Sequence, residues 1–367
     1  MGDLETYFDN ASTSPLDPRV LEAMLPFLRE ECGNAHSVHQ PGLRARAAVE
    51  RAREQVASLV GAEDPAEIVF TSGATESNNW VLRAFPESAV SAFEHASIRV
   101  PAARSGAEVI PHRGLAVEPE PDFRWTDGRP TRGLVSLMLV NNEIGTVWNP
   151  TAWRPFAERL HSDLTQSVGK IPVDVQELDL DFASFSAHKF HGPKGIGALY
   201  IRGMEPVPPL LGGGDQENGL RAGTLNVPAI VGMGEAARIA AEEQARDYEH
   251  AAKLRQITLG SIGDLADFRA NGGPCVSPFI LSLSFLGIEG ETLVIELDHR
   301  GFSVSSGAAC SAQKHEPSAV LAAIEPDDAW RRGTIRISFG RTNTPDAAER
   351  LGLNIRQAVQ TLRKLKV

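Results

Sequence analysis

The spacing of apolar residues along the chain predicts helices that alternate with strands. Between Gly42 and Val60, apolar side chains recur at helical intervals with arginine and glutamate between them, which is typical of an amphipathic helix. The segment 67–70, Glu-Ile-Val-Phe, predicts a short buried strand, and the segments 134–140 and 195–201 predict further interior strands. Because strands that alternate with helices form mainly parallel sheets, we predict an α/β domain.

The last third of the chain follows a different pattern. The stretch from Pro228 to about Leu259 is rich in alanine, glutamate and arginine and predicts one long helix that could bridge two domains. Beyond it, residues 279–285 and 334–339 alternate apolar and polar side chains as half-exposed strands do. We therefore expect a smaller α+β unit after the α/β unit.

A chain of 367 residues is longer than a single hydrophobic core usually supports. We expect a large domain over 13–245, and a small domain made of residues 1–12 and 246–367.

The composition excludes several classes of function. A net charge of -11 argues against nucleic acid or an anionic membrane as the main partner, since both attract clustered lysine and arginine. No long apolar run predicts a membrane span, and the first residues do not resemble a signal peptide. The chain has three cysteines, Cys32, Cys275 and Cys310, which are odd in number and far apart in the sequence. This suits a reducing compartment, so we expect a cytoplasmic protein. His188 and His191, and likewise His36 and His39, have spacings that a metal could use, but no carboxylate or cysteine completes a ligand set, so we expect no metal site.

Lys189 lies in a polar turn between two apolar runs, with Ser186 and His188 beside it. At the end of a strand, such a lysine can serve as a covalent anchor for an aldehyde cofactor. Taken alone, a lysine in a turn is more often structural or simply exposed. Its meaning depends on the rest of the chain.

Two further turns could bind parts of a cofactor. The turn 71–77 places small hydroxyl residues and a glycine before a predicted helix, whose N-terminal N–H groups could bind a phosphate; an ordinary helix cap would also explain it. Asp163, at a strand end, could hold a proton on a ring nitrogen, and Gln166 could reach a ring substituent. A simple helix cap is the alternative for Asp163.

Polar residues also follow other predicted strands. The segment 141–145, Asn-Asn-Glu-Ile-Gly, directly follows an apolar run, which places it at the carboxyl edge of the sheet where ligands collect; a plain turn is the alternative. His95 could be functional or a satisfied structural histidine. The glycine-rich loop 211–224 lacks the strand and helix of a dinucleotide site, and the glycines at 232–237 fall inside the predicted long helix.

Cys310 differs from the other cysteines because small residues and Gly307 surround it and a polar stretch follows. This composition suggests an exposed, mobile loop in which a thiol could travel to a substrate. With an ordinary pKa near about 8.5, the thiol would need a base to act as a nucleophile, and His95 is the natural candidate.

These motifs appear in one fixed order: the phosphate turn, His95, Asn-Asn-Glu-Ile-Gly, Asp-x-Thr-Gln, Ser-x-His-Lys, the glycine-rich loop ending in Arg-x-Gly-Thr, and Ser-Ser-Gly-x-x-Cys. Together they closely resemble the cysteine desulfurases, which are pyridoxal-phosphate enzymes of fold type I and of the class-V aminotransferase family. The resemblance extends from Tyr7 to Arg341, nearly the whole chain.

The resemblance implies a role for each matching residue. Lys189 would hold pyridoxal 5'-phosphate covalently and later act as a base on the substrate. Arg336 would bind the substrate carboxylate, and Thr224 would reach the phosphate of a neighbouring subunit in a homodimer. The cofactor would also contact Ala74, Thr75, His95, Asn142, Asp163, Gln166, Ser186 and His188, with Asn142 touching the substrate as well.

For Cys310, the resemblance implies a thiol that takes sulfur from L-cysteine and passes the resulting persulfide to an acceptor protein, in iron–sulfur cluster assembly or in thiolation. A selenocysteine lyase, another class-V aminotransferase, or a non-catalytic assembly partner are the alternatives. The chain departs from the family pattern at Ala35, His36 and Leu164 and in a short segment before Asp163.

Overall fold

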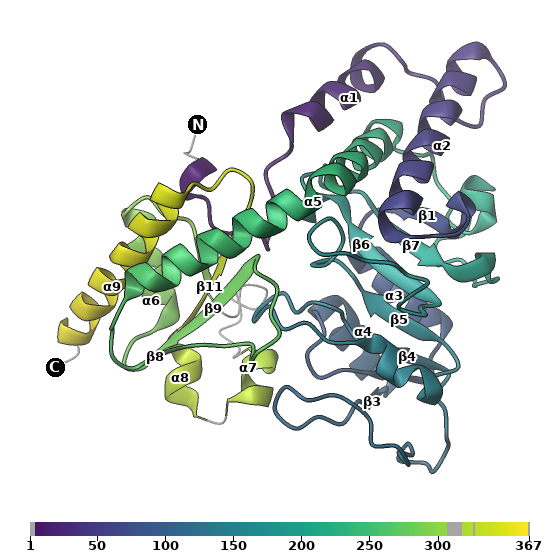
Figure 1. Ribbon diagram of the computed structural model, residues 1–367. Helices are drawn as coiled ribbons and strands as arrows, with labels where there is room; N and C mark the ends of the chain where they lie inside the picture. The colour runs from purple at the N-terminus through teal and green to yellow at the C-terminus, as the bar shows by residue number, and fades with distance from the viewer. Residues whose placement is uncertain (1–3, 307–317, 326, 366–367) are drawn as a thin grey trace.

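The computed structural model describes residues 4–306, 318–325 and 327–365. In this part of the chain two β-sheets organise the fold, each in its own half of the molecule (Figure 1). The larger sheet has seven strands in the order β1 (Ile68–Thr71), β7 (Gly197–Ile201), β6 (Phe182–Ser186), β5 (Leu160–Asp163), β4 (Leu134–Ser136), β2 (Ser88–Val90) and β3 (Glu108–Val109). Strand β7 is antiparallel to both of its neighbours, whereas the other neighbouring strands pair in parallel.

This topology confirms the predicted mainly parallel sheet and has a direct consequence for function. Because β7 runs opposite to β1 and β6, those two strands run in the same direction as β5, β4 and β2. The loops that follow these five strands therefore leave the sheet at the same carboxyl edge.

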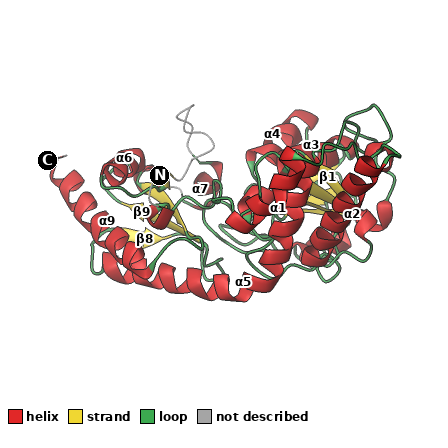
Figure 2. Ribbon diagram, turned by 90° about the horizontal axis from the view of Figure 1, so that it is seen from above, coloured by secondary structure: helices red, strands yellow, loops and turns green. Residues whose placement is uncertain are grey.

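Helices cover both faces of the large sheet (Figures 1 and 2). On one face lie α1 (Pro18–Arg29), α2 (Gln40–Val60) and the first half of α5 (Val227–Ile262), and on the other α3 (Ala74–Ala84) and α4 (Ala96–Ser105). The helices predicted at 42–60 and 228–259 are both present, and α5 continues past the large sheet to the smaller one. No helix among the described residues is long and apolar enough to cross a membrane.

The glycines of α5 serve helix packing. A Cβ atom at Gly234 would lie 2.5 Å from the Cα atom of Ala52 on α2, and one at Gly232 would lie 2.6 Å from the Met24 sulfur on α1. Only glycine allows α5 to approach these helices so closely. The loose dinucleotide pattern at 232–237 is therefore a packing feature.

The smaller sheet is antiparallel, with the order β10 (Ser305–Ser306), β11 (Thr334–Ser338), β9 (Ile280–Phe285) and β8 (Phe268–Ala270). Around it lie α6 (Gly290–His299), α7 (Ala319–Ile324), α8 (Asp328–Arg332), α9 (Pro345–Leu365) and the far half of α5. The N-terminal segment joins this unit, because the Phe8 N–H donates to the Ser303 carbonyl at 2.8 Å and the Phe8 ring lies in its core. Short 3₁₀ helices complete the fold at Leu4–Thr6, Pro65–Glu67, Pro150–Phe156, Ala187–Lys189, Arg202–Met204 and Gln216–Gly219.

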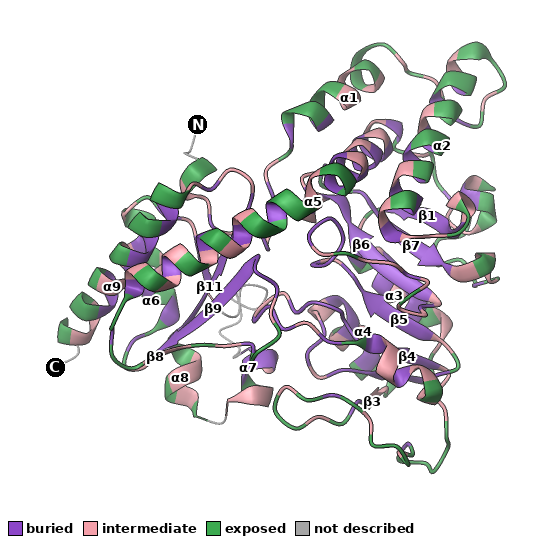
Figure 3. Ribbon diagram, in the orientation of Figure 1, coloured by how far each residue is buried: buried purple, intermediate pink, exposed green. Residues whose placement is uncertain are grey.

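Two expectations about strands were wrong in detail. Strands β9 and β11 are buried on both faces rather than half-exposed (Figure 3). Their apolar side chains fill the core, while their polar face is covered by other chain segments; for example, Asn271 donates to the hydroxyls of Ser282 at 3.1 Å and Ser284 at 2.9 Å. Strand β4 ends at Ser136, so it is shorter than the strand predicted over 134–140. The next residue still lies beside β5, since the Leu137 N–H donates to the His161 carbonyl at 3.2 Å.

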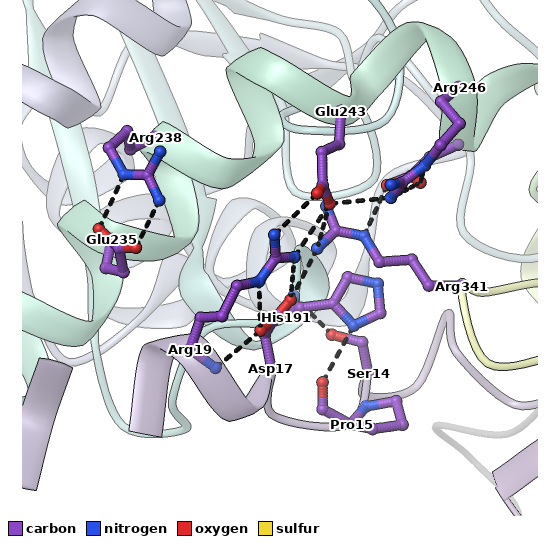
Figure 4. Close-up of polar contacts among 11 residues, drawn as sticks. Ser14, Pro15, Asp17, Arg19, His191, Glu235, Arg238, Glu243, Arg246 and Arg341 are labelled. Carbon is purple, nitrogen blue, oxygen red and sulfur yellow. Dashed lines mark hydrogen bonds and ion pairs between the residues drawn. The ribbon is translucent and has the colours of Figure 1, made fainter. Parts of the chain in front are cut away.

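An ionic cluster ties the two halves of the molecule together (Figure 4). Arg341, just after β11, binds Asp17 at 3.0 Å, Glu243 at 3.3 Å and Asp247 at 2.6 Å. Arg19 binds the same Asp17 and Glu243 carboxylates, each at 2.7 Å. The hydrogen bonds from Arg19, helped by the charge of Arg341, lower the pKa of both Asp17 and Glu243 to about 2.

We expect Arg341→Met to lower the free energy of unfolding by about 2 kcal/mol at pH 7, because three little-exposed carboxylates lose a shared partner. The low folded-state pKa values make these ion pairs fully stabilising above about pH 4.5, and their contribution is lost as the pH falls toward 2. The gap between wild type and variant should therefore narrow below about pH 4.5 in denaturant titrations. A difference that stays constant with pH would contradict the prediction. As a control, Arg238→Met removes only solvent-accessible pairs within α5 and should change stability by less than about 0.5 kcal/mol.

Candidate active site

A cavity of about 290 Å³ opens at the carboxyl edge of the large sheet, on the side where Arg336 of the smaller sheet reaches it. Its wall comes from the loops after β1, β2, β4, β5 and β6, from the N-terminal segment and from β11. The residues predicted from the sequence that line it are Ala74, Thr75, His95, Asn142, Asp163, Gln166, Ser186, His188, Lys189 and Arg336. Ala11, Ser12, Ser97, Met138, Val140 and Thr165 complete the lining.

Lys189 ends the 3₁₀ turn that follows β6, and this turn carries its side chain to the cavity. Its Nζ atom donates to the backbone carbonyls of Ala11 and Ser12, both at 2.7 Å. The N-terminal segment thus holds the amine at the cavity wall. In these two contacts the acceptors are neutral backbone carbonyls and not a carboxylate.

The predicted phosphate turn opens α3. Gly73 precedes the helix with φ +153°, a backbone conformation that side chains other than glycine rarely adopt. Ala74 and Thr75 follow in the first turn, where N–H groups lack partners within the helix, and the Ala74 N–H donates to the Ser186 hydroxyl at 2.7 Å. Helix N-terminus and hydroxyl therefore converge on one part of the cavity, an arrangement that suits an anion.

Asp163 ends β5 and is 4% exposed. One carboxylate oxygen, Oδ1, accepts the Thr165 N–H at 2.9 Å within the turn that follows β5. No helix begins among the described residues between β5 and β6, so this contact is not the helix cap considered as the alternative for Asp163. The other, Oδ2, accepts an N–H of Asn78 at 2.8 Å. The carboxylate is thereby oriented at the cavity wall, and the hydroxyl of Thr165 is buried there with no hydrogen-bond partner among the described residues.

Gln166 owes its orientation to Lys170, which the sequence did not single out. The buried Lys170 Nζ donates to Gln166 Oε1 at 2.6 Å, while Gln166 Nε2 donates to the Ala11 carbonyl at 2.9 Å. Both contacts fix which end of the amide carries the amino group: Nε2 lies against Ala11, another cavity-lining residue, and keeps a second hydrogen that it can donate to an acceptor. Burial, with repulsion from Lys189 and Arg336, lowers the pKa of Lys170 to about 7.

Burial also keeps the cavity histidines neutral near pH 7. It lowers the pKa of His188 to about 4, with the charge of Lys189 acting in the same direction, and His188 Nδ1 contacts the Thr13 hydroxyl at 3.1 Å. His95 begins α4 and likewise has a pKa lowered by burial. Its Nδ1 atom accepts the Ser97 N–H at 3.1 Å, so His95 both caps a helix and faces the cavity.

Arg336 reaches the cavity from β11 and is 3% exposed. Its two terminal nitrogens donate to the Asn142 carbonyl at 2.8 Å, to Asp9 at 2.9 Å and to the Ser12 hydroxyl at 2.7 Å. Its Nε atom is buried without a hydrogen-bond partner among the described residues. A buried guanidinium with an unused donor is well suited to bind a carboxylate.

Thr224 lies away from this cavity, exposed in the glycine-rich loop. Two ion pairs fasten that loop to helices beside the large sheet: Arg53 of α2 binds Glu217 with two contacts of 2.8 Å, and Arg221 binds Glu76 in the first turn of α3 at 2.9 Å. Glu217 also accepts the Phe70 N–H at 2.7 Å. Thr224 is thus held near the start of α3 but outside the pocket of its own chain.

Comparison with known proteins gives a consistent answer. The family model described as aminotransferase class-V matches residues 6–351. The chain is 40% identical to a cysteine desulfurase IscS of Dictyoglomus turgidum, over 93% of this chain and 91% of the relative. The chain belongs to the cysteine desulfurases of the class-V aminotransferase family.

Other relatives of this family agree. A cysteine desulfurase of Homo sapiens is 40% identical over 98% of this chain and 82% of its own length. Among solved structures, a NifS-like protein superposes with a TM-score of 0.84 at 36% identity, covering 98% of this chain and all 100% of that one. SspA in complex with cysteine gives a TM-score of 0.74 at 31% identity, covering 92% of this chain and 100% of that one.

Members of this family depend on pyridoxal phosphate. The cavity fits such a group in its chemistry, because a helix N-terminus, an oriented carboxylate, a lysine and the unpartnered hydroxyl of Thr165 all face one space. The positive charges of Lys189 and Arg336 also suit a ligand that carries a phosphate and a carboxylate.

Cys310, the predicted nucleophile of the family, lies outside the described residues, but both ends of its segment are described. Ser305 and Ser306 of β10 pair with Arg336 and Ile335. At the other end, the Ser318 hydroxyl donates to the carboxylate of Glu143, the residue after Asn142. Both ends are therefore fastened next to residues of the cavity wall.

The departures from the family pattern lie outside the cavity lining. Leu164 is fully buried and belongs to the core of the large half, as does Ala35, while His36 is exposed on the loop before α2. The short segment before Asp163 forms the 3₁₀ helix at 150–156 and the four-residue strand β5. Several side chains that shape the site were missed in the sequence, namely Asp9, Ser12, Asn78, Ser97 and Lys170, because no local pattern marks them.

Proposed function

We propose that this protein converts L-cysteine to L-alanine and transfers the sulfur atom to Cys310. The reaction balances without a further reactant: the thiol of Cys310 gains the sulfur of the substrate as a persulfide, and the substrate carbon that loses sulfur gains hydrogen to become the methyl group of alanine. The observation that carries the proposal is the convergence of Lys189, Asp163 and Arg336 on one cavity in a chain of this family.

The residues of the cavity would divide the binding of pyridoxal phosphate among them. Ala74, Thr75, Ser186 and His188 would hold the phosphate at the start of α3, and Asp163 would keep the ring nitrogen protonated. Gln166 offers a donor to the ring oxygen, because Lys170 fixes its amide. When bound, the cofactor supplies an electron sink that makes the substrate Cα–H bond acidic.

The substrate would be oriented by its carboxylate. Arg336 offers the unused Nε donor and a planar fork, and the neighbouring Asn142 borders the same space. Lys189 would take the Cα proton as a base, because its Nζ atom and the guanidinium of Arg336 both contact Ser12 and so lie on the same side of the cavity.

The position of Cys310 in the chain supports its role as sulfur acceptor. A residue four positions after Ser306 lies within about 14 Å of it in any conformation, because an extended chain advances at most about 3.6 Å per residue. Ser306 lies in the strand that pairs with β11 beside Arg336. The thiol is thus tethered near the substrate site, which raises its effective concentration there.

We further propose a homodimer, in which Thr224 contributes to the phosphate site of the partner subunit. Thr224 is exposed and outside the cavity of its own chain, yet two ion pairs hold its loop in place, as a contact across an interface requires. The persulfide would then be passed to an acceptor protein, for cluster assembly or thiolation.

The direct test is a product assay with protein loaded with pyridoxal phosphate. With L-cysteine and a thiol reductant, we expect alanine and sulfide in equal amounts, because the reductant releases each transferred sulfur. Formation of a 2-oxo acid from cysteine without alanine would instead indicate transamination and refute the proposal. With L-selenocysteine in place of cysteine, a much higher kcat/KM would favour the selenocysteine lyase alternative.

A further inference from the structure

A chain of hydrogen bonds links Asp163 to His95 through two residues that the proposed reaction has not used. Asn78, on α3, donates from its Nδ2 atom to Asp163 Oδ2 at 2.8 Å and to Ser97 Oγ at 2.9 Å. Ser97, in the first turn of α4, places Oγ 2.8 Å from His95 Nδ1. The Ser97 N–H donates to the same Nδ1 atom at 3.1 Å.

The donors decide where the proton of His95 resides. A backbone N–H can only donate, so His95 Nδ1 must be an acceptor in its contact with the Ser97 backbone. Ser97 Oγ accepts from Asn78, which leaves its own hydrogen for Nδ1. In the neutral ring the proton therefore resides on Nε2, the nitrogen at the far end of the ring.

Asn78 is itself fixed in orientation. Asp163 can only accept, so the amino group of the Asn78 amide must point to it. The amide oxygen, Oδ1, is buried and has no hydrogen-bond partner among the described residues. Leaving a buried oxygen without a hydrogen bond lowers stability. In this orientation the amino group of Asn78 donates to both Asp163 and Ser97.

We propose that Ser97 and Asn78 are positioning residues that hold His95 in the Nε2–H tautomer, so that the ring offers a hydrogen-bond donor to the substrate. For His95 to cap the helix, only the contact with the Ser97 N–H is needed. The Ser97 hydroxyl and the Asn78 amide add a connection from His95 to Asp163. The effect on turnover rests on the proposed function, whereas the tautomer does not.

This assignment changes the role first considered for His95. A neutral ring protonated on Nε2 has its one lone pair on Nδ1, where Ser97 already donates. His95 in this state cannot remove the proton of the Cys310 thiol, so it acts as a donor in the cavity rather than as the base for that thiol.

The test combines nitrogen NMR of histidine with kinetics on the full-length protein loaded with pyridoxal phosphate. With 15N-labelled histidine, and with His95 assigned by its loss in His95→Gln, we expect an acceptor-type shift for Nδ1 and a protonated-type shift for Nε2. In Ser97→Ala the Nδ1 resonance should move toward that of a weaker acceptor. The kcat with L-cysteine should fall about tenfold, the effect of one lost hydrogen bond, with KM within about twofold.

Two variants make the result specific. Ser97→Thr keeps the hydroxyl and should restore both the resonance and kcat, whereas Ser105→Ala, an exposed serine of the same helix, should change neither. A proton on Nδ1 in the wild-type protein would overturn the proposal. So would unchanged His95 resonances in Ser97→Ala, with or without a fall in kcat. If the wild-type protein formed no alanine, the proposed function would fail while the tautomer result would still stand.

Discussion

Replacing Lys189 with alanine should abolish covalent cofactor binding and lower alanine formation by at least about a thousandfold, because both the anchor and the base are lost. Lys189 Nζ lies at the cavity wall, in hydrogen bonds with the Ala11 and Ser12 carbonyls. Absorbance of the dialysed protein reports the bound cofactor, and an alanine assay reports the rate. Lys189→Arg should fail as well, since it keeps the charge but provides no primary amine.

A matched control comes from the same molecule. Lys253 is an exposed lysine on α5, where alanine is readily accommodated, and Lys253→Ala should keep both the absorbance and the rate of the wild-type protein. Full activity in Lys189→Ala, in protein that remains folded by circular dichroism, would refute the assignment of Lys189.

Replacing Cys310 with alanine should leave cofactor binding intact and lower alanine formation by at least about a hundredfold, because no tethered thiol remains to take the sulfur. The cofactor absorbance should stay, since each cavity-lining residue of the proposed cofactor site is retained. This pattern separates Cys310 from Lys189, whose loss removes cofactor and activity together.

The other two cysteines provide the controls for Cys310. Cys32 and Cys275 are both exposed, and neither lines the cavity, so Cys32→Ser and Cys275→Ser should keep the wild-type rate. A Cys310→Ala protein that still produced alanine and sulfide at the wild-type rate would show that sulfur leaves the substrate by another route.

The residues that could be predicted from the sequence share one property: most of them follow strands. Lys189 and Asn142 come soon after apolar runs, and Asp163 lies at the end of a strand. A mainly parallel sheet brings such positions to one edge, so their order along the chain contains much of the site. Arg336 was identified only through the family resemblance, because the sequence around it, 334–339, has the alternation of an ordinary strand and no feature that marks a site.

The residues that were missed act through partners distant in the sequence. Asn78 is within a helix and Lys170 within a turn, where both look like common polar side chains; their roles depend on Asp163 and Gln166, which the fold brings to them.

Contacts between distant segments also explain the wrong expectation that β9 and β11 are half-exposed. Alternation shows that the two faces of a strand differ, but a polar face can be covered by another part of the chain, as Asn271 covers Ser282 and Ser284.

The proposed reaction leaves a sulfur atom on one particular side chain. Protein loaded with pyridoxal phosphate would be mixed with L-cysteine, alkylated without reductant, digested, and the peptides containing Cys32, Cys275 and Cys310 compared by mass spectrometry. We predict one added sulfur on the Cys310 peptide, formed with alanine in equal amount and absent from Lys189→Ala. Alanine formation with no sulfur on Cys310, or with the sulfur on Cys32 or Cys275 instead, would contradict the account.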